Sequence, residues 1–125
     1  MSVSNPYQTY QENAVFTAKP AELTLMLYNG CLKFIGLAKN AVEKKDIEEK
    51  HINITKAQNI ITELIVTLNH NNAIANEMKR LYEYMNRRLV EGNIKNDSSI
   101  LSEVEGLVRE FRDTWKEAMQ LAKQK

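Results

Sequence analysis

The chain has 125 residues, 43% of them hydrophobic, and a formal net charge of +1. This length and composition suit one folded domain with a single core, and the near-zero charge gives no sign of nucleic-acid binding or of an anionic membrane surface. No uncharged apolar run could span a membrane, the first residues lack the pattern of a secretory signal, and one cysteine excludes an intramolecular disulfide, so we expect a soluble cytoplasmic protein.

The first 18 residues are predicted to form a separate N-terminal arm. Residues 5–8 (NPYQ) are typical of a helix cap followed by a first-turn proline. A short cap helix there would place Tyr7 and Tyr10 on one side. The arm is too short to enclose a core of its own. We therefore expect it to rest on the domain formed by residues 19–125, or to be ordered by a partner.

Hydrophobic periodicity predicts four long helices after the arm. Asp46, Asn72 and Asp97 are suited to cap the last three of them, Glu49 would complete a capping box with Asp46, and Gly92-Asn93 would end the third. The connections are short, which makes sequential helices antiparallel. The expected fold is all-α, an antiparallel up-down-up-down four-helix bundle with a short N-terminal arm or cap helix. The helices are expected at about Pro20–Lys44, Ile47–His70, Ala73–Glu91 and Ser98–Lys123.

The first predicted helix is apolar around most of its circumference. A surface helix needs an apolar arc of roughly 100°, and the stretch KPAELTLMLYNGCLKFIGLAKNAV covers about twice that arc. One stripe is assigned to the core: Leu23, Leu27, Cys31, Phe34 and Ala38. The surplus, with two side chains of the second helix that lie off its main face, predicts the wall of a groove for an apolar partner segment. The groove residues are Leu25, Tyr28, Leu32, Ile35, Ile52 and Val66.

Three explanations of this apolar surplus remain open. The N-terminal arm could cover it, a partner segment could occupy it, or the arm could cover it until the partner arrives. In a different class of function, a second copy of the chain would cover it, which would make the protein a scaffold or dimerisation bundle with weak self-association.

Signals for catalysis or metal binding are weak. His51 belongs to a single Glu-x-x-His spacing, whereas di-metal bundles need two such motifs and further inward glutamates. His70 ends a predicted helix, where a cation meets the helix dipole. Cys31 lies among apolar residues and is expected to be a buried, inert thiol. We predict no enzyme, no metal and no cofactor. A histidine phosphotransfer domain is the catalytic alternative, but the residues after both histidines do not match such domains.

The basic residues of the third predicted helix do not indicate nucleic-acid binding. Glu77, Glu83 and Glu91 interleave with them at helical spacings that permit ion pairs. There is also no aromatic platform beside them on which bases could stack. A solvated, partly paired face is the expectation.

Several motifs, in this order along nearly the whole chain, resemble the family of flagellar secretion chaperones called FliS. They are NPYQTY (residues 5–10), PAEL (20–23), MLYNG (26–30), KAQNII (56–61), YEYMNRRL (82–89), NIKND (93–97), VEGL (104–107) and WKE (115–117). The resemblance implies a cytoplasmic export chaperone without ATPase activity, built on an antiparallel helical bundle.

The resemblance also implies partners. Members of this family bind the disordered C-terminal segment of flagellin and prevent its premature polymerisation. They aid its delivery to the flagellar type III export apparatus, at the export gate protein FlhA. The tyrosines of the arm, here Tyr7 and Tyr10, would take part in that handover.

Overall fold

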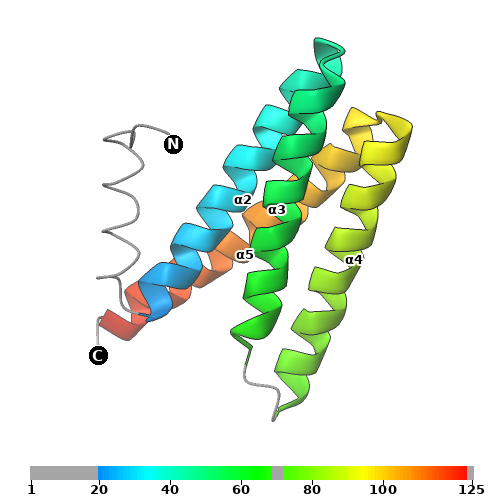
Figure 1. Ribbon diagram of the computed structural model, residues 1–125. Coiled ribbons are helices and arrows are strands. Elements are labelled where there is room, and N and C mark those ends of the chain that lie inside the picture. Colours follow the sequence, from blue (N-terminus) through cyan, green and yellow to red (C-terminus); the bar gives the residue numbers. More distant parts are fainter. Residues whose placement is uncertain (1–19, 69–71, 124–125) are drawn as a thin grey trace, which may run out of the picture.

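The computed structural model describes residues 20–68 and 72–123, and this part of the chain folds into four α-helices (Figure 1). Their bounds are Pro20–Glu43 for α2, Ile47–Val66 for α3, Ala73–Lys95 for α4 and Ser98–Lys123 for α5. The predicted all-α helical bundle is confirmed. None of the described helices is long and apolar enough to cross a membrane. The N-terminal arm, with Tyr7 and Tyr10, lies outside the described residues, as does His70.

The predicted N-caps of α3, α4 and α5 are confirmed. In each, the cap side chain accepts a hydrogen bond from a backbone N–H in the first turn, which has no partner within the helix. The acceptor and donor residues are Asp46 and Glu49 (3.1 Å), Asn72 and Ala75 (2.7 Å), and Asp97 and Ser99 (2.9 Å).

Three expectations about helix ends were wrong. Helix α3 ends at Val66 and not near His70. The reciprocal bond of the capping box does not form, because the Asp46 N–H donates to the Ala41 carbonyl at 2.9 Å. Helix α4 also continues past Gly92 to Lys95, and its C-cap is Asn96, whose φ of 52° is left-handed. Gly92 lets α4 and α5 approach closely, since a Cβ there would lie 2.9 Å from a Leu101 methyl group.

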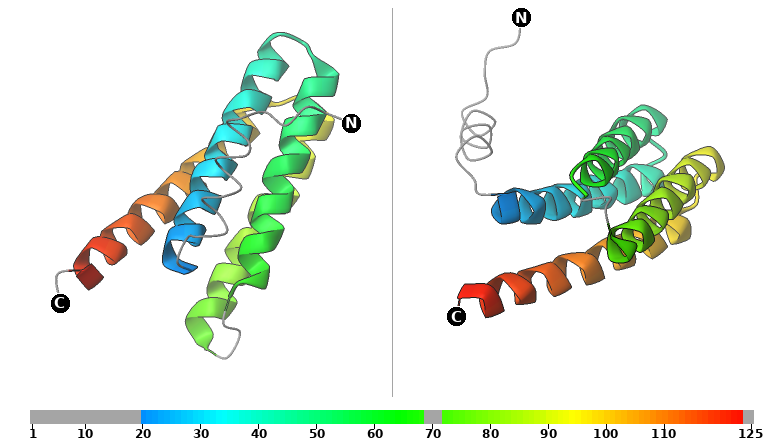
Figure 2. Two further views of the ribbon diagram at one scale, coloured as in Figure 1. Left: turned by 60° about the vertical axis from the view of Figure 1, so that its left-hand side comes forward. Right: turned by 90° about the horizontal axis from the view of Figure 1, so that it is seen from below.

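The four helices pack in a ring. Helix α2 lies against α3 and α5, and α4 lies against the same two helices on the other side. Sequential helices are antiparallel (Figure 1). Toward the end of the bundle that holds Pro20 and Lys123, α2 and α5 stay together but diverge from α3 and α4 (Figures 1 and 2).

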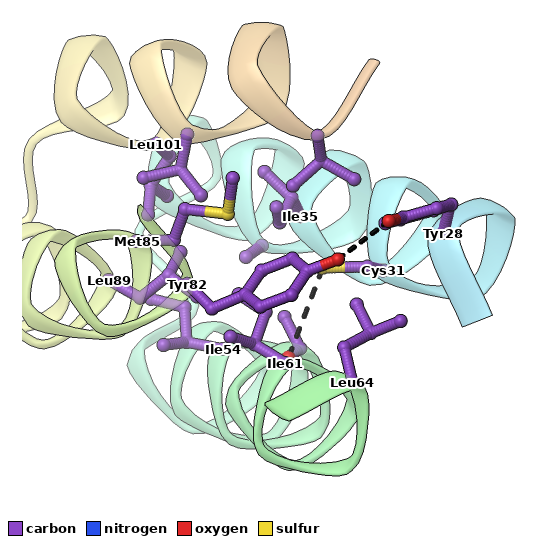
Figure 3. Close-up of a cluster of buried hydrophobic side chains, with 14 residues drawn as sticks. Tyr28, Cys31, Ile35, Ile54, Ile61, Leu64, Tyr82, Met85, Leu89 and Leu101 are labelled. Carbon is purple, nitrogen blue, oxygen red and sulfur yellow. Dashed lines mark hydrogen bonds between the residues drawn. The ribbon is translucent and has the colours of Figure 1, made fainter. Parts of the chain in front are cut away.

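The core stripe of α2 differs from the predicted one. Its buried residues include Tyr28, Cys31, Ile35 and Ala38, with the alternating spacing of three and four that suits a bundle seam. Figure 3 shows them among side chains from all four helices. Of the stripe assigned to the core from sequence, only Cys31 and Ala38 are buried, and the other three side chains are half-buried: Leu23, Leu27 and Phe34.

Candidate functional site

The expected surface position of Tyr28 and Ile35 is wrong, because both lie in the core with exposed fractions of 2% and 0%. The Tyr28 hydroxyl can be buried because it shares a 2.6 Å hydrogen bond with the Tyr82 hydroxyl of α4 (Figure 3). Sequence periodicity could not identify this partner, which lies 54 residues further along the chain. The two stripes of α2 are similarly apolar, so nothing within the helix selects between them.

The other predicted groove residues do not lie on one surface. Leu25 and Leu32 share a side of α2 with Lys39, since residues seven apart lie on the same helix face. The Lys39 ammonium forms a 3.0 Å ion pair with Glu105 of α5, so this side of α2 faces α5. Ile52 and Val66 are exposed on α3, which packs against α2 and α4. The structure does not bring the six residues together in one groove.

An apolar pocket opens instead between α2, α4 and α5. It has a volume of about 390 Å³. Its lining residues on α5 belong to the middle and the second half of that helix. The lining consists of Tyr28, Met78, Glu110, Phe111, Thr114, Trp115 and Ala118.

The pocket forms because the apolar stripe of α5 continues beyond the fully buried core. Val104 and Val108 are buried, whereas Phe111, Trp115 and Met119 further along the same stripe are only half-buried. The five residues follow one another at helical spacings of three and four, so periodicity alone indicates that all five face the core. Met78 of α4 still lines the pocket beside Phe111 and Trp115, so α4 covers this second half of the stripe only in part.

Trp115 is fixed in place at one side of the pocket. Its indole Nε1–H donates to the Ala21 carbonyl oxygen at 2.9 Å. This bond joins the start of α2 to the second half of α5 and satisfies the polar atom of the ring. The rest of the indole is an apolar surface for the pocket, as is usual when a tryptophan binds through its nitrogen.

The floor of the pocket is aromatic and uncharged. The Phe111 ring makes edge-to-face contacts with Tyr28 and Tyr82, at centroid distances of 6.4 Å and 5.6 Å. Burial raises the pKa of Tyr28, and the hydrogen bond that it shares with Tyr82 has a smaller, lowering effect. Burial also raises the pKa of Tyr82, and there the shared hydrogen bond adds to the increase. Both hydroxyls therefore stay neutral at physiological pH, which keeps the floor suited to apolar groups.

Exposed apolar side chains lie near the pocket on α4 and at the same end of the bundle on α3. Ile74 is 73% exposed and lies one turn before Met78, a lining residue, and Leu81 is exposed one turn after it. Val66, at the end of α3, is 66% exposed at the same end of the bundle. A pocket with such a border is typical of a binding surface for an apolar segment.

The residues considered for chemistry form no reactive site in the described part of the chain. Cys31 is fully buried, donates to the Ala57 carbonyl from Sγ at 3.9 Å, and has a pKa raised by burial to about 12. His51 is exposed, with Nδ1 3.1 Å from the Asn93 side-chain nitrogen. Within residues 20–68 and 72–123 no group of three or more His, Cys, Asp or Glu side chains is arranged to hold a metal ion.

The basic residues of α4 are partly paired, as predicted. Glu91 accepts ion pairs from Arg88 and from Lys95, and Glu77 pairs with Arg80. Glu103 of α5 joins this network, because its carboxylate accepts bonds from Arg88 at 2.8 Å and from the Tyr84 hydroxyl at 2.6 Å. The sequence did not indicate this link between α4 and α5.

Comparison with known proteins places the chain in one family. A family model described as "Flagellar protein FliS" matches residues 3–122. The "Flagellar secretion chaperone FliS" of Bacillus subtilis (strain 168) is 59% identical over 120 residues, covering 96% of this chain and 90% of that protein. "Flagellar secretion chaperone FliSB" of Pseudomonas aeruginosa is 39% identical, covering 92% and 94% respectively. The Escherichia coli (strain K12) protein is 35% identical, covering 86% and 82%.

Proposed function

The chain belongs to the FliS family of flagellar secretion chaperones, and we propose that it binds the disordered C-terminal segment of flagellin in the cytoplasm. In this role it prevents premature polymerisation and aids delivery of flagellin to the flagellar type III export apparatus. Relatives from three organisms, aligned over most of their length, carry the name of flagellar secretion chaperone. An export chaperone acts by binding its client, so this function requires neither a catalytic site nor a nucleotide.

One observation supports a binding role above the others. The apolar pocket is lined by side chains of α2, α4 and α5, and none of its lining residues comes from α3. Its floor and walls are the aromatic residues Tyr28, Phe111 and Trp115. Large aromatic side chains at the centre of an apolar pocket are typical anchors for a partner's side chain. An amphipathic client helix would insert one apolar residue there and lay its neighbours on the exposed border.

The physical chemistry of the client fits such a surface. A disordered segment that folds on binding carries an ordering cost, so a useful affinity needs a long contact path. We propose that this path starts at the pocket and includes exposed or half-buried apolar residues outside it. These are Leu25 and Leu32 on α2 and Ile52 and Val66 on α3. Tyr28 would act as the floor of the pocket, and Ile35 would support it from within the core.

Release of flagellin requires a second interaction. We propose that the arm residues Tyr7 and Tyr10 take part in the handover at the export gate protein FlhA. The arm precedes Pro20 directly, and Pro20 lies at the end of the bundle that carries the pocket. Client release and contact with the export gate would then involve neighbouring parts of the chaperone.

Calorimetric titration of the full chain with a peptide of the flagellin C-terminal segment tests this function. We expect saturable 1:1 binding and an increase of the peptide's helical circular dichroism on binding. Light scattering on the same samples tests the alternative of a scaffold. A stable dimer that does not bind the peptide would contradict the chaperone function and would support a scaffold that self-associates.

A further inference from the structure

The bundle has a second pocket at its other end, where the α2–α3 and α4–α5 connections lie. Its volume is about 420 Å³, within the range of small-ligand sites. It differs from the apolar pocket in being lined by two lysines and a carboxamide as well as by aliphatic residues. The lining consists of Ala41, Val42, Lys45, Asp46, Ile47, Lys50 and Asn96.

Lys50 is the unusual member of this lining, because its exposed fraction is only 5%. Its ammonium donates to the Asn93 carbonyl at 2.8 Å and to Oδ1 of Asn96. Lys50 and Asn96 both line the pocket, so this bond joins two lining residues from different helices. A lysine ammonium has three N–H donors, and these two bonds use two of them.

No carboxylate of residues 20–68 and 72–123 forms an ion pair with this buried ammonium. Its two acceptors are uncharged, although the end of α4 at Asn93 adds the partial negative charge of a helix C-terminus. The acidic residue of the lining, Asp46, already caps α3 by accepting from Glu49 N–H at 3.1 Å. Burial of a charge is unfavourable unless an opposite charge or enough hydrogen bonds accompany it.

We propose that this pocket binds a carboxylate carried on an aliphatic group, with the third N–H of Lys50 as the donor to the carboxylate. Lys45 adds a second positive charge to the lining, so the two lysines and Asp46 leave one net positive charge for a monoanion. The remaining walls, Ala41, Val42 and Ile47, are aliphatic and suit an aliphatic body. A carboxylate that accepts a bond from a buried ammonium forms a charge-assisted hydrogen bond, which is about twice as strong as a neutral one.

Two sources offer this chemistry, a free branched carboxylic acid and the C-terminus of a peptide that ends in an aliphatic residue. The experiment uses the isotope-labelled full chain and follows the backbone amide signals of residues 45–47 and 96 by NMR. The probes are N-acetyl-leucine, its uncharged analogue N-acetyl-leucinamide, and isovalerate. We expect N-acetyl-leucine to shift these signals with an affinity in about the millimolar range, and the amide to leave them unchanged. Equal responses to acid and amide, or no response to any probe, would overturn the proposal.

Comparison of the two acids identifies the source. Tighter binding of N-acetyl-leucine supports a peptide terminus as the ligand, and equal or tighter binding of isovalerate supports a free acid. Both results support a carboxylate site. Because flagellin binding is measured separately at the opposite end of the bundle, failure here leaves the chaperone function untouched.

Substitutions test whether Lys50 is the donor. Lys50→Met keeps the aliphatic stem and removes the charge, and we expect it to weaken N-acetyl-leucine binding at least about tenfold. Lys56→Met is the matched control, because Lys56 is an exposed lysine on α3 outside the lining, and we expect unchanged binding.

A second pair of variants keeps the test decisive if Lys50→Met does not fold. Ile47→Glu adds a negative charge at an exposed position of the lining, and Val90→Glu adds one at an exposed position of α4 outside it. We expect only Ile47→Glu to weaken binding. Unchanged binding in a folded Lys50→Met variant, or equal loss in the two glutamate variants, would contradict the proposal.

Discussion

The hydroxyl oxygens of Tyr28 and Tyr82 lie 2.6 Å apart in the core and join α2 to α4, two helices that are not neighbours in the ring (Figure 3). The bond sets which stripe of α2 faces inward, because a tyrosine hydroxyl is buried only where it finds a partner. Both rings also make edge-to-face contacts with Phe111, which lines the apolar pocket together with Tyr28. The position of the core and the shape of the apolar pocket therefore depend on one contact.

The first prediction concerns this pair. Tyr82→Phe should lower the free energy of unfolding by about 1–3 kcal/mol, because it leaves the buried Tyr28 hydroxyl without its partner. Tyr28→Phe should have a similar effect for the same reason. The double variant should lose clearly less than the sum of the two single variants, since both polar groups are then gone. Urea unfolding of the four proteins measures this cycle, and strictly additive losses would mean that the hydroxyls do not interact.

The second prediction concerns two glycines with opposite surroundings. Gly92→Ala should destabilise the protein by about 1 kcal/mol, because overpacking against buried Leu101 outweighs the gain in helix propensity. Gly106→Ala should stabilise it by up to about 1 kcal/mol, since a Cβ there meets nothing within 4 Å. Thermal and urea melts measure both changes. Changes of the same sign would show that α4 and α5 do not approach each other closely at Gly92.

The third prediction concerns the pH dependence that Cys31 adds. Burial raises the pKa of its thiol from 9.0 to about 12, so the folded state holds the proton over a range in which the unfolded state releases it. The stability from this group is fully present below pH 9 and is lost as the pH rises above that value. The loss should be about 1.4 kcal/mol per pH unit between pH 9 and 12.

Urea unfolding from pH 8 to 10.5 of the natural chain and of Cys31→Ala isolates this effect. The difference in unfolding free energy between the two proteins should change with that slope, because other titrating groups are common to both. A constant difference across the range would mean that the thiol is not buried. A thiol reagent gives an independent check, since it should modify Cys31 only at the rate of unfolding.

Local signals explain what could be predicted from the sequence. Asp46, Asn72 and Asp97 were identified as caps because a cap depends on neighbours two or three residues away. Helix count and order followed from periodicity for the same reason. The inward stripe of α2 was predicted wrongly because it depends on the bond between Tyr28 and Tyr82. The end of α4 was predicted wrongly because Gly92 allows the close approach of Leu101 and does not end the helix.

The candidate site was predicted only in part, for a related reason. The sequence predicted a binding surface on α2 and α3, but the pocket is formed largely by Met78, Phe111 and Trp115 of α4 and α5. These residues continue regular core stripes, so periodicity assigns them to the interior. Their exposure arises from the divergence of α2 and α5 from α3 and α4, which is set by the packing of all four helices. No pattern within one helix reports that divergence.

We propose that the pocket between α2, α4 and α5 receives an apolar side chain of flagellin. One calorimetric experiment tests this binding directly. The flagellin C-terminal peptide is titrated into the natural chain, into Ala118→Glu and into Gln120→Glu. Ala118 is exposed and lines the pocket, whereas Gln120 is exposed on the same helix outside the lining. We predict at least about tenfold weaker binding to Ala118→Glu, a loss of roughly 1.4 kcal/mol or more, and unchanged binding to Gln120→Glu. Equal affinity of the peptide for all three proteins would contradict the claim.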